Sequence, residues 1–352
     1  MTTSVPFGIL LALISIEEVD EKSQTFSSVI LLLYKWKDEY LRWNTSEYET
    51  RHLRVPAKNI WVPSICTANE LAGKMCMTYE SEKENEAFIH YTGLVTLYHT
   101  TKSTIQCKIN LQKYPFDEQK CTFEFKSLFA AIHQLEMNEE YSLVEASYGT
   151  YNGEWSLVST EKKIRSRQDK DNQSLGYQLD FTIKIRRRPT MGILTVMFPI
   201  ITLSIMNVFC FVLPIAEGEK VGMSMAIFLT FAVYATLLSE NMPSSADNIS
   251  WFSIYVTTQV ILSALTIILQ SIVLRIYHQC PQCERKVDTL GYRLKTTTEG
   301  TRKHDPVVGS EELTTIKTRN NEDIALRMEN VFMVCTICIN FVSICLLFVN
   351  IL

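Results

Sequence analysis

The sequence predicts an all-β sandwich followed by a bundle of four transmembrane helices, and three observations lead to this fold class. The first is a period-two alternation of apolar and polar residues within residues 1–189, which is typical of strands with one buried face. The second is a set of four apolar runs, each close to the roughly 20 residues that cross a bilayer core. These runs cover 191–213, 221–238, 251–274 and 331–352. The third is the distribution of basic residues between the loops.

Composition excludes several classes of function. The chain has 352 residues and a net charge of -4, which is too mild to suggest nucleic acid as a partner. The sequence contains no recognisable helix-borne metal site, nucleophile elbow or phosphate-binding glycine loop. We therefore expect no enzyme activity, no cofactor and no metal.

The β domain is defined by its alternation and its turns. Alternation is clearest in 105–112, 122–126 and 181–186, and turn signals such as Asn152-Gly153 separate the alternating segments. This pattern predicts an antiparallel sandwich. Residues 7–16 are apolar enough for a signal peptide, but they lack a basic start and acidic residues follow them, so we interpret them as a strand. We expect that a signal peptide preceded the numbered chain and was removed.

The basic residues orient the chain in the membrane. The segment from Arg275 to Arg327, with both ends included, contains ten Lys and Arg, and the segment from Asn241 to Leu274 contains none. Positive charge favours the cytoplasm, so the long loop is expected inside and the β domain outside the plasma membrane. The expected domains are 1–189, the first three helices in 190–274, a cytoplasmic loop with an amphipathic helix in 275–326, and the fourth helix in 327–352.

The second apolar run carries an unusual stripe. Its helical spacing places small and apolar residues on one face with a carboxylate at each end. The stripe contains Glu219, Gly222, Ala226, Leu229, Val233, Thr236, Leu237 and Glu240. Such a face suits a water-filled passage between several copies of the helix, because the carboxylates would form two rings that concentrate cations.

Cysteines fall into two compartments. Four lie in the extracellular domain, where disulfides persist: Cys66, Cys76, Cys107 and Cys121. The other six lie in the spans or in the cytoplasmic loop. Disulfides are therefore expected only among the first four.

Several motifs together resemble one known family. They are the thirteen residues between Cys107 and Cys121 with Pro115-Phe116-Asp117 among them, Trp61-Val62-Pro63, Asn152-Gly153-Glu154-Trp155, Arg186-Arg187-Arg188-Pro189 and Gly218-Glu219-Lys220. The chain resembles, over nearly its whole length, the Cys-loop pentameric ligand-gated ion channels, and most closely their cation-conducting nicotinic and serotonin-type branch. This resemblance implies a ring of five subunits, ligand binding between extracellular sandwiches, and a pore lined by the second helix. It also implies a Cys107–Cys121 bridge, which leaves Cys66 and Cys76 as a second pair by elimination.

The resemblance assigns roles along the pore. Leu229, with Val233 above it, matches the family's hydrophobic gate, although Leu229 could also be an ordinary packed leucine. Glu219 and Glu240 match the inner and outer selectivity rings, or are simply charges at helix ends. Anion-selective relatives carry an inserted Pro-Ala-Arg at the inner mouth, so Gly218-Glu219-Lys220 implies cation selectivity.

Coupling residues follow from the same resemblance. Glu21 and Arg187 match a buried acid and base that join the sandwich to the chain entering the membrane; the alternative is two solvated surface charges. Phe116 and Asp117 are expected to press on the turn 241–250.

The ligand site departs from the family pattern. Amine-gated relatives surround a cation with aromatic rings, but the matching positions here are Leu31, Ala68 and Leu128. Tyr148, Tyr151 and Tyr177 are the remaining nearby candidates, and each could equally be a packed surface tyrosine. We therefore expect acetylcholine and serotonin to be poor agonists. Asn44 and Asn172 begin glycosylation motifs on the extracellular side.

Two functional hypotheses remain at this point. The first is a homopentameric cation channel that contacts four further subunits, membrane lipid and a small extracellular ligand of unknown identity. Monovalent cations would permeate, and permeation by divalent cations stays open. The second is a non-conducting or obligate partner subunit, which the missing aromatic cage favours.

Overall fold

The computed structural model describes residues 5–71, 76–77, 85–127, 135–145, 153–168, 174–213, 219–241, 249–278 and 309–351. The chain divides into two compact units, each of which we describe by itself. The first comprises Met1–Leu111, Pro115–Pro189 and Asn241–Asn248, and the second comprises Gln112–Tyr114, Thr190–Glu240 and Ile249–Leu352.

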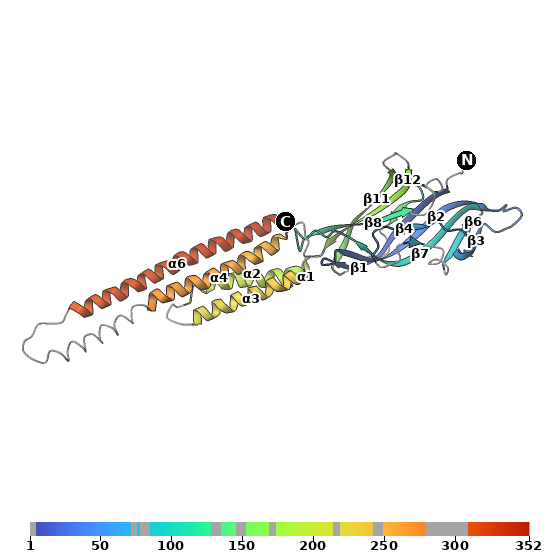
Figure 1. Ribbon diagram of the computed structural model, residues 1–352. Helices are drawn as coiled ribbons and strands as arrows, with labels where there is room; N and C mark the ends of the chain where they lie inside the picture. The colour runs from blue at the N-terminus through green and yellow to red at the C-terminus, as the bar shows by residue number, and fades with distance from the viewer. Residues whose placement is uncertain are drawn as a thin grey trace, which may run out of the picture. The chain divides into compact units, whose positions relative to one another are not determined.

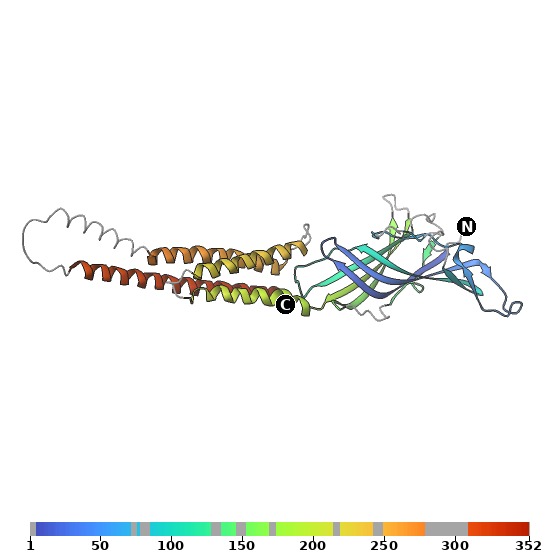
Figure 2. The same cartoon turned by 90° about the horizontal axis from the view of Figure 1, so that it is seen from below.

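The first unit contains two sheets, which are visible in Figure 1 and Figure 2. One sheet has the strand order β10-β1-β2-β7-β6-β3, and β9 also pairs with β1. Its strands are β1 (Val5–Asp20), β2 (Thr25–Arg42), β3 (His52–Pro56), β6 (Glu86–His90), β7 (Thr92–Gln106), β9 (Leu135–Met137) and β10 (Leu143–Glu145). The other sheet has the order β11-β12-β8-β4-β5. Its strands are β4 (Ile65–Thr67), β5 (Cys76–Met77), β8 (Glu118–Ser127), β11 (Trp155–Gln168) and β12 (Ser174–Arg187). A short 3-10 helix, η1 (Ala57–Asn59), follows β3.

The predicted sandwich is confirmed, with two corrections. Residues 122–126 lie in β8 and 181–186 in β12, as the alternation predicts, and the apolar residues 7–16 lie in β1, as expected. The sheet is not purely antiparallel, because β9 and β10 pair with β1 in parallel. The expected strand through residues 107–111 is also wrong, since β7 ends at Gln106. These residues still alternate in burial, but side chains satisfy their backbone: Gln24 accepts from the Ile109 N–H at 2.7 Å, and Gln119 from the Asn110 N–H at 2.8 Å.

Aromatic residues from both sheets fill the core of the sandwich. Phe26 of β2 meets Phe123 of β8 edge to face, with ring centroids 6.1 Å apart. Phe125 and Phe181 pack similarly across β8 and β12, at 5.7 Å. All four rings are buried, and burying a side chain of this size contributes about 1.5–3 kcal/mol. The period-two alternation thus places one face of each sheet in this core.

The second unit contains helices α1 (Thr190–Gly192), α2 (Phe198–Phe209), α3 (Glu219–Asn241), α4 (Trp251–His278) and α6 (Gly309–Ile351). A π-helical turn, η2 (Ile193–Met197), joins α1 to α2 directly before Pro199. Proline has no N–H to donate within a helix, which favours an irregular turn here. Four helices are long and apolar enough to cross a membrane: Thr190–Phe209, Glu219–Glu240, Trp251–Tyr277 and Asp323–Ile351.

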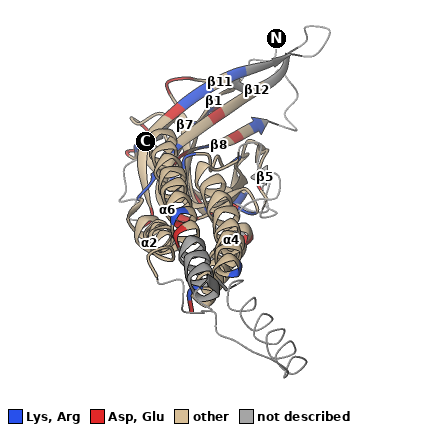
Figure 3. Cartoon of the chain, turned by 90° about the vertical axis from the view of Figure 1, so that its left-hand side faces the viewer, with Lys and Arg blue, Asp and Glu red and all other residues tan. Residues whose placement is uncertain are grey.

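Helix α6 packs against α4 through Val273, Ala325 and their neighbours. The expected amphipathic helix and the fourth span form one continuous helix, whereas 279–308 of the expected loop lie outside the described residues. Charged residues are sparse along the described helices and more frequent on the strands, as the colours in Figure 3 show. Polar contacts inside the bundle include a 2.9 Å hydrogen bond between the hydroxyls of Ser204 and Tyr255.

Candidate pore, coupling and ligand sites

Helix α3 has two faces with opposite burial. All eight residues of the predicted stripe are exposed in the single chain, including Leu229 at 61% and Val233 at 57%. The opposite face is buried against the chain's own helices and contains Lys220, Ser224, Ile227 and Phe231. The intervals between these buried residues are four, three and four, which is the period of a helix. The predicted stripe is therefore free to face something outside this chain.

The exposed stripe is open along its length. A methyl group added at Gly222 would meet nothing within 4 Å, so this position of the stripe would stay open even with a side chain. The carboxylates of Glu219 and Glu240 are exposed at opposite ends of the stripe. Between them the stripe presents Leu229 and Val233, whose apolar side chains would narrow and dry a passage formed by several copies.

Arg187 lies at the centre of a cluster of acids in the first unit. Its Nε donates to Asp117 Oδ1 at 2.9 Å, its Nη2 to Glu21 Oε1 at 2.5 Å, and its Nη1 to Glu154 Oε1 at 2.5 Å. The guanidinium carbon also lies 4.2 Å from the centroid of the Trp155 ring, within reach of a cation–π interaction. The pair that the sequence predicts, Glu21 with Arg187, is thus brought together, and its charges are not merely solvated.

Burial distinguishes the three acids. The exposed fraction of the side chain is 1% for Asp117, 25% for Glu21 and 59% for Glu154, against 5% for Arg187. Burial by itself lowers the pKa of the Arg187 guanidinium, but the charge and hydrogen bond of Asp117, followed by the hydrogen bond and charge of Glu21, outweigh burial and raise this pKa. Arg187 therefore stays charged, and the Asp117 pair is the contact most shielded from water.

The Asp117 carboxylate has two hydrogen-bond partners within the sandwich. It accepts from Arg187 Nε at 2.9 Å and from Gln119 Nε2 at 2.5 Å. Its expected contact with the turn 241–250 stays a prediction, because residues 242–248 lie outside the described residues. The Arg187 N–H also donates to the Asp117 carbonyl at 3.1 Å, which fixes the two residues side by side. Phe116 is half-buried, and most of the turn it was expected to press on lies outside the described residues.

Sequence reasoning missed the roles of Glu154 and Trp155 in this cluster. Both belong to the motif Asn152-Gly153-Glu154-Trp155, which was noted only as a family signature. The register of β11 and β12 places Trp155 opposite Arg187, so the contact follows from strand pairing. Local sequence patterns carry no direct signal of such pairing.

A disulfide joins Cys107 to Cys121, with Cα atoms 5.2 Å apart, and closes the predicted loop. Both cysteines are buried. Cys66 is also disulfide-bonded and lies opposite Cys76 in the β4–β5 pair. The side chain of Cys76 lies outside the described ones, so the Cys66–Cys76 bridge stays a prediction.

The positions expected around the ligand fall on different sheets of the single chain. Ala68 directly follows β4 and Tyr177 lies in β12, two strands of the same sheet, whereas Leu31 lies in β2 of the other sheet. All three are half-buried. Leu128, Tyr148 and Tyr151 lie outside the described residues. Among the described positions, Tyr177 supplies the one aromatic ring.

Of the two predicted glycosylation sites, the structure describes one. The Asn44 side chain is exposed, and its Oδ1 accepts from the Ser46 N–H at 3.0 Å in a local turn. Asn172 lies outside the described residues. Neither prediction is tested by these observations.

The chain belongs to the neurotransmitter-gated ion channels. The profile described as "Neurotransmitter-gated ion-channel ligand binding domain" matches residues 2–189, and that of the "Neurotransmitter-gated ion-channel transmembrane region" matches 196–337. The sandwich is therefore extracellular, and the four apolar helices span the plasma membrane. The expectation that the protein is not an enzyme agrees with this family.

Similar curated proteins are subunits of acetylcholine receptors. The goldfish (Carassius auratus) neuronal acetylcholine receptor subunit non-alpha-2 is 28% identical over 79% of this chain and 59% of its own length. The Caenorhabditis elegans acetylcholine receptor subunit beta-type acr-2 is 27% identical over 80% of this chain and 49% of its own. The human neuronal acetylcholine receptor subunit alpha-2 is 27% identical over 79% and 51%, respectively. The matched region thus spans about half the length of these relatives.

Proposed function

We propose that this chain is one subunit of a pentameric, cation-selective, ligand-gated channel in which α3 of each copy lines the pore. The observation that carries the proposal is the opposite burial of the two faces of α3. A carboxylate is costly against lipid but not against water. A stripe that begins at Glu219 and ends at Glu240 therefore fits a water-filled passage better than hydrocarbon.

In the proposed ring, the pore has three functional levels. Five copies of Glu219 and of Glu240 form inner and outer rings that attract cations and repel anions. Between them, rings of Leu229 and Val233 close the passage by excluding water, because apolar walls in a narrow pore disfavour a hydrated ion. Opening requires these side chains to move away from the axis.

The ligand site is proposed to form between neighbouring sandwiches. Ala68 and Tyr177 of one copy would face Leu31 of the next, since these positions lie on different sheets of one chain. Such a site offers little of the aromatic surface that attracts a desolvated ammonium group. The ligand is therefore a small extracellular molecule other than acetylcholine or serotonin, although the relatives named above are acetylcholine receptor subunits. Whole-cell currents under each amine test this step, and robust activation at micromolar concentration would contradict it.

Expression of the chain alone in oocytes tests the whole proposal. Replacing the exposed gate residue with a polar one, Leu229→Ser, should produce a steady leak current whose reversal potential follows sodium. The matched control is Phe231→Ser, on the buried face of the same helix, which should lower surface expression and give no leak. Leu229→Ser protein that reaches the surface without leak, or a reversal potential that follows chloride, rejects the proposal.

A second candidate is a partner subunit that conducts only together with another chain. The apolar residues Leu31 and Ala68 at expected cage positions favour it, because they leave the lone chain without a complete amine site. This candidate predicts no leak from Leu229→Ser alone and a leak when a nicotinic subunit is co-expressed. The same recordings therefore separate the two candidates.

A further inference from the structure

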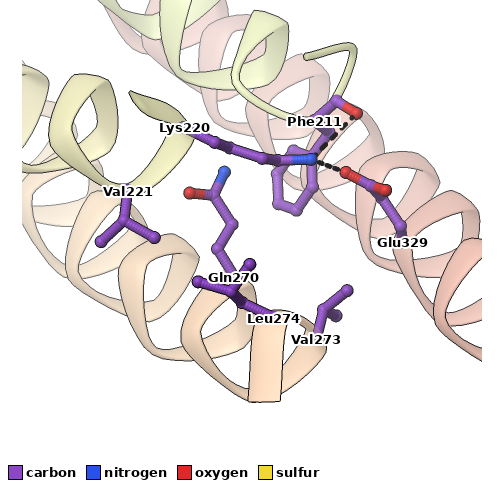
Figure 4. A pocket seen from close by; sticks show the side chains of 7 residues that line it. All are labelled: Phe211, Lys220, Val221, Gln270, Val273, Leu274 and Glu329. Carbon is purple, nitrogen blue, oxygen red and sulfur yellow. Dashed lines mark hydrogen bonds and ion pairs between the residues drawn. The ribbon is translucent and has the colours of Figure 1, made fainter. Parts of the chain in front are cut away.

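A buried ion pair connects the first turn of α3 to α6, the last of the four apolar spans. Among the residues of α2, α3, α4 and α6 whose burial the structure describes, Lys220 and Glu329 are the charged side chains that are buried. The Lys220 ammonium pairs with the Glu329 carboxylate, although the two residues lie on α3 and α6. Figure 4 shows the Lys220 side chain extending away from Val221 toward α6.

Glu329 faces inward because of the register of α6. Buried residues on this helix recur at Ala325, Glu329, Thr336 and Asn340, which lie on one helical face. The same face packs on α4, where Val273 meets Ala325. Glu329 is thus held in the bundle by apolar neighbours, and its charge is balanced by Lys220.

Backbone carbonyl groups stabilise the Lys220 ammonium. Its Nζ donates to the carbonyl of Leu213 at 3.0 Å and reaches that of Phe211 at 3.5 Å. The residues that line the cavity beside it include Phe211, Glu329 and Gln270, and the Nε2 of Gln270 has no hydrogen-bond partner in the described part of the chain. The volume of this cavity is about 10 Å³, enough for about one water molecule and too small for a hydrated counter-ion. Glu329 therefore supplies the charge that Lys220 requires.

Lys220 directly follows Glu219, the proposed inner ring of the pore. We propose that Glu329 is a positioning residue for permeation, because it holds the Lys220 ammonium inside the bundle and away from the Glu219 ring. This inference rests on the proposed channel function. It adds Glu329, which lies on α6 rather than on the proposed pore-lining helix α3.

Loss of Glu329 would release a charge next to the ring. A buried ammonium without a counter-ion is costly, and the long lysine stem lets it move to the nearest water. At the inner end of α3 that water is the cytoplasmic mouth of the proposed pore. Five ammonium groups beside five Glu219 carboxylates would cancel much of the field that concentrates cations there.

Single-channel recording of the full chain in a Leu229→Ser background, in symmetric sodium without divalent ions, tests this inference. Glu329→Gln should lower the conductance roughly twofold or more, because the ring loses its net charge. The double variant Lys220→Gln with Glu329→Gln should return the conductance to near the background value, since no mobile ammonium remains. Glu329→Asp, which keeps the charge, should stay near that value. Asp323→Asn, on an exposed position of the same helix, is the matched control and should change nothing.

The outcomes separate this inference from the channel proposal. No current from the Leu229→Ser background itself counts against the proposed function. Current in the background with an unchanged conductance in Glu329→Gln overturns the inference. A double variant that conducts as poorly as Glu329→Gln also overturns it, because Glu329 would then only support the packing of the bundle. If Glu329→Gln fails to reach the surface, the double variant is compared with the background instead: a conductance near the background value supports the inference, and a conductance reduced roughly twofold or more overturns it.

Discussion

Replacing Arg187 by glutamine should strongly destabilise the extracellular sandwich. The substitution keeps some hydrogen-bonding capacity but removes the cation that faces Asp117, Glu21 and Glu154. The Asp117 carboxylate is 1% exposed, so water cannot replace the lost partner. Breaking a buried pair in this way costs about 3–5 kcal/mol. For a domain of this size, each kcal/mol corresponds to about 2–4 °C, so the midpoint of thermal unfolding should fall by roughly 6–20 °C.

The assay is the fraction of detergent-purified protein that keeps its size-exclusion peak after heating. The double variant Arg187→Gln with Asp117→Asn should recover roughly half or more of the loss, because it leaves no unpaired buried charge. Glu118→Gln is the matched control: Glu118 pairs with Lys184 and Arg186 on the surface, and its loss should not move the midpoint. An Arg187→Gln midpoint within about 2 °C of wild type would refute the reasoning. A double variant that is no better than the single one would refute it as well.

Three further predictions concern the pore and the acid stability of the chain. Phe231→Ala on the buried face of α3 should reduce assembled protein, with a cost of about 3–5 kcal/mol, whereas Leu229→Ala should leave the amount of assembled protein unchanged and alter gating; surface labelling and currents measure both. Glu219→Gln and Glu240→Gln should each lower sodium conductance without loss of surface protein, and an unchanged single-channel conductance in both would contradict the two rings. The hydroxyl and N–H of Ser23 hold the pKa of Asp20 below its ordinary value of 3.8. Because the pKa is lower in the folded state, this stabilisation is present above about pH 3.8 and is lost as the pH falls through the lower folded-state value. Ser23→Ala should therefore reduce stability near neutral pH and have little effect in strong acid, as unfolding at a series of pH values would reveal.

Periodic patterns predicted much of the fold. Alternation identified β8 and β12 because each strand has one face in the aromatic core. Helical spacing identified which residues of α3 are exposed, since the residues that pack on the chain's own helices recur with the same period. The expected strand at 107–111 failed because the side chains of Gln24 and Gln119 accept from the backbone N–H groups of Ile109 and Asn110, while the residues of this segment still alternate in burial. A pattern of buried and exposed residues cannot distinguish these contacts from a ladder of backbone hydrogen bonds.

Charge clusters were predicted less completely. The pairing of Glu21 with Arg187 followed from family motifs, but the stronger partner, Asp117, depends on a contact between residues 70 positions apart. Lys220 and Glu329 lie still further apart in the chain, and each looks like an ordinary helix-end charge in isolation. Such pairs are set by how strands and helices meet, so the sequence shows the charges without showing which of them combine.

In the proposed channel, the exposed face of α3 lines a water-filled pore. Cysteine substitution in the Leu229→Ser background measures this directly, by the effect of a hydrophilic, positively charged thiol reagent on the current. Val233→Cys is predicted to be blocked, while Ile227→Cys on the buried face and the background channel with its native cysteines should be unaffected. Block at Ile227→Cys, or an unmodified current at Val233→Cys, would contradict the account.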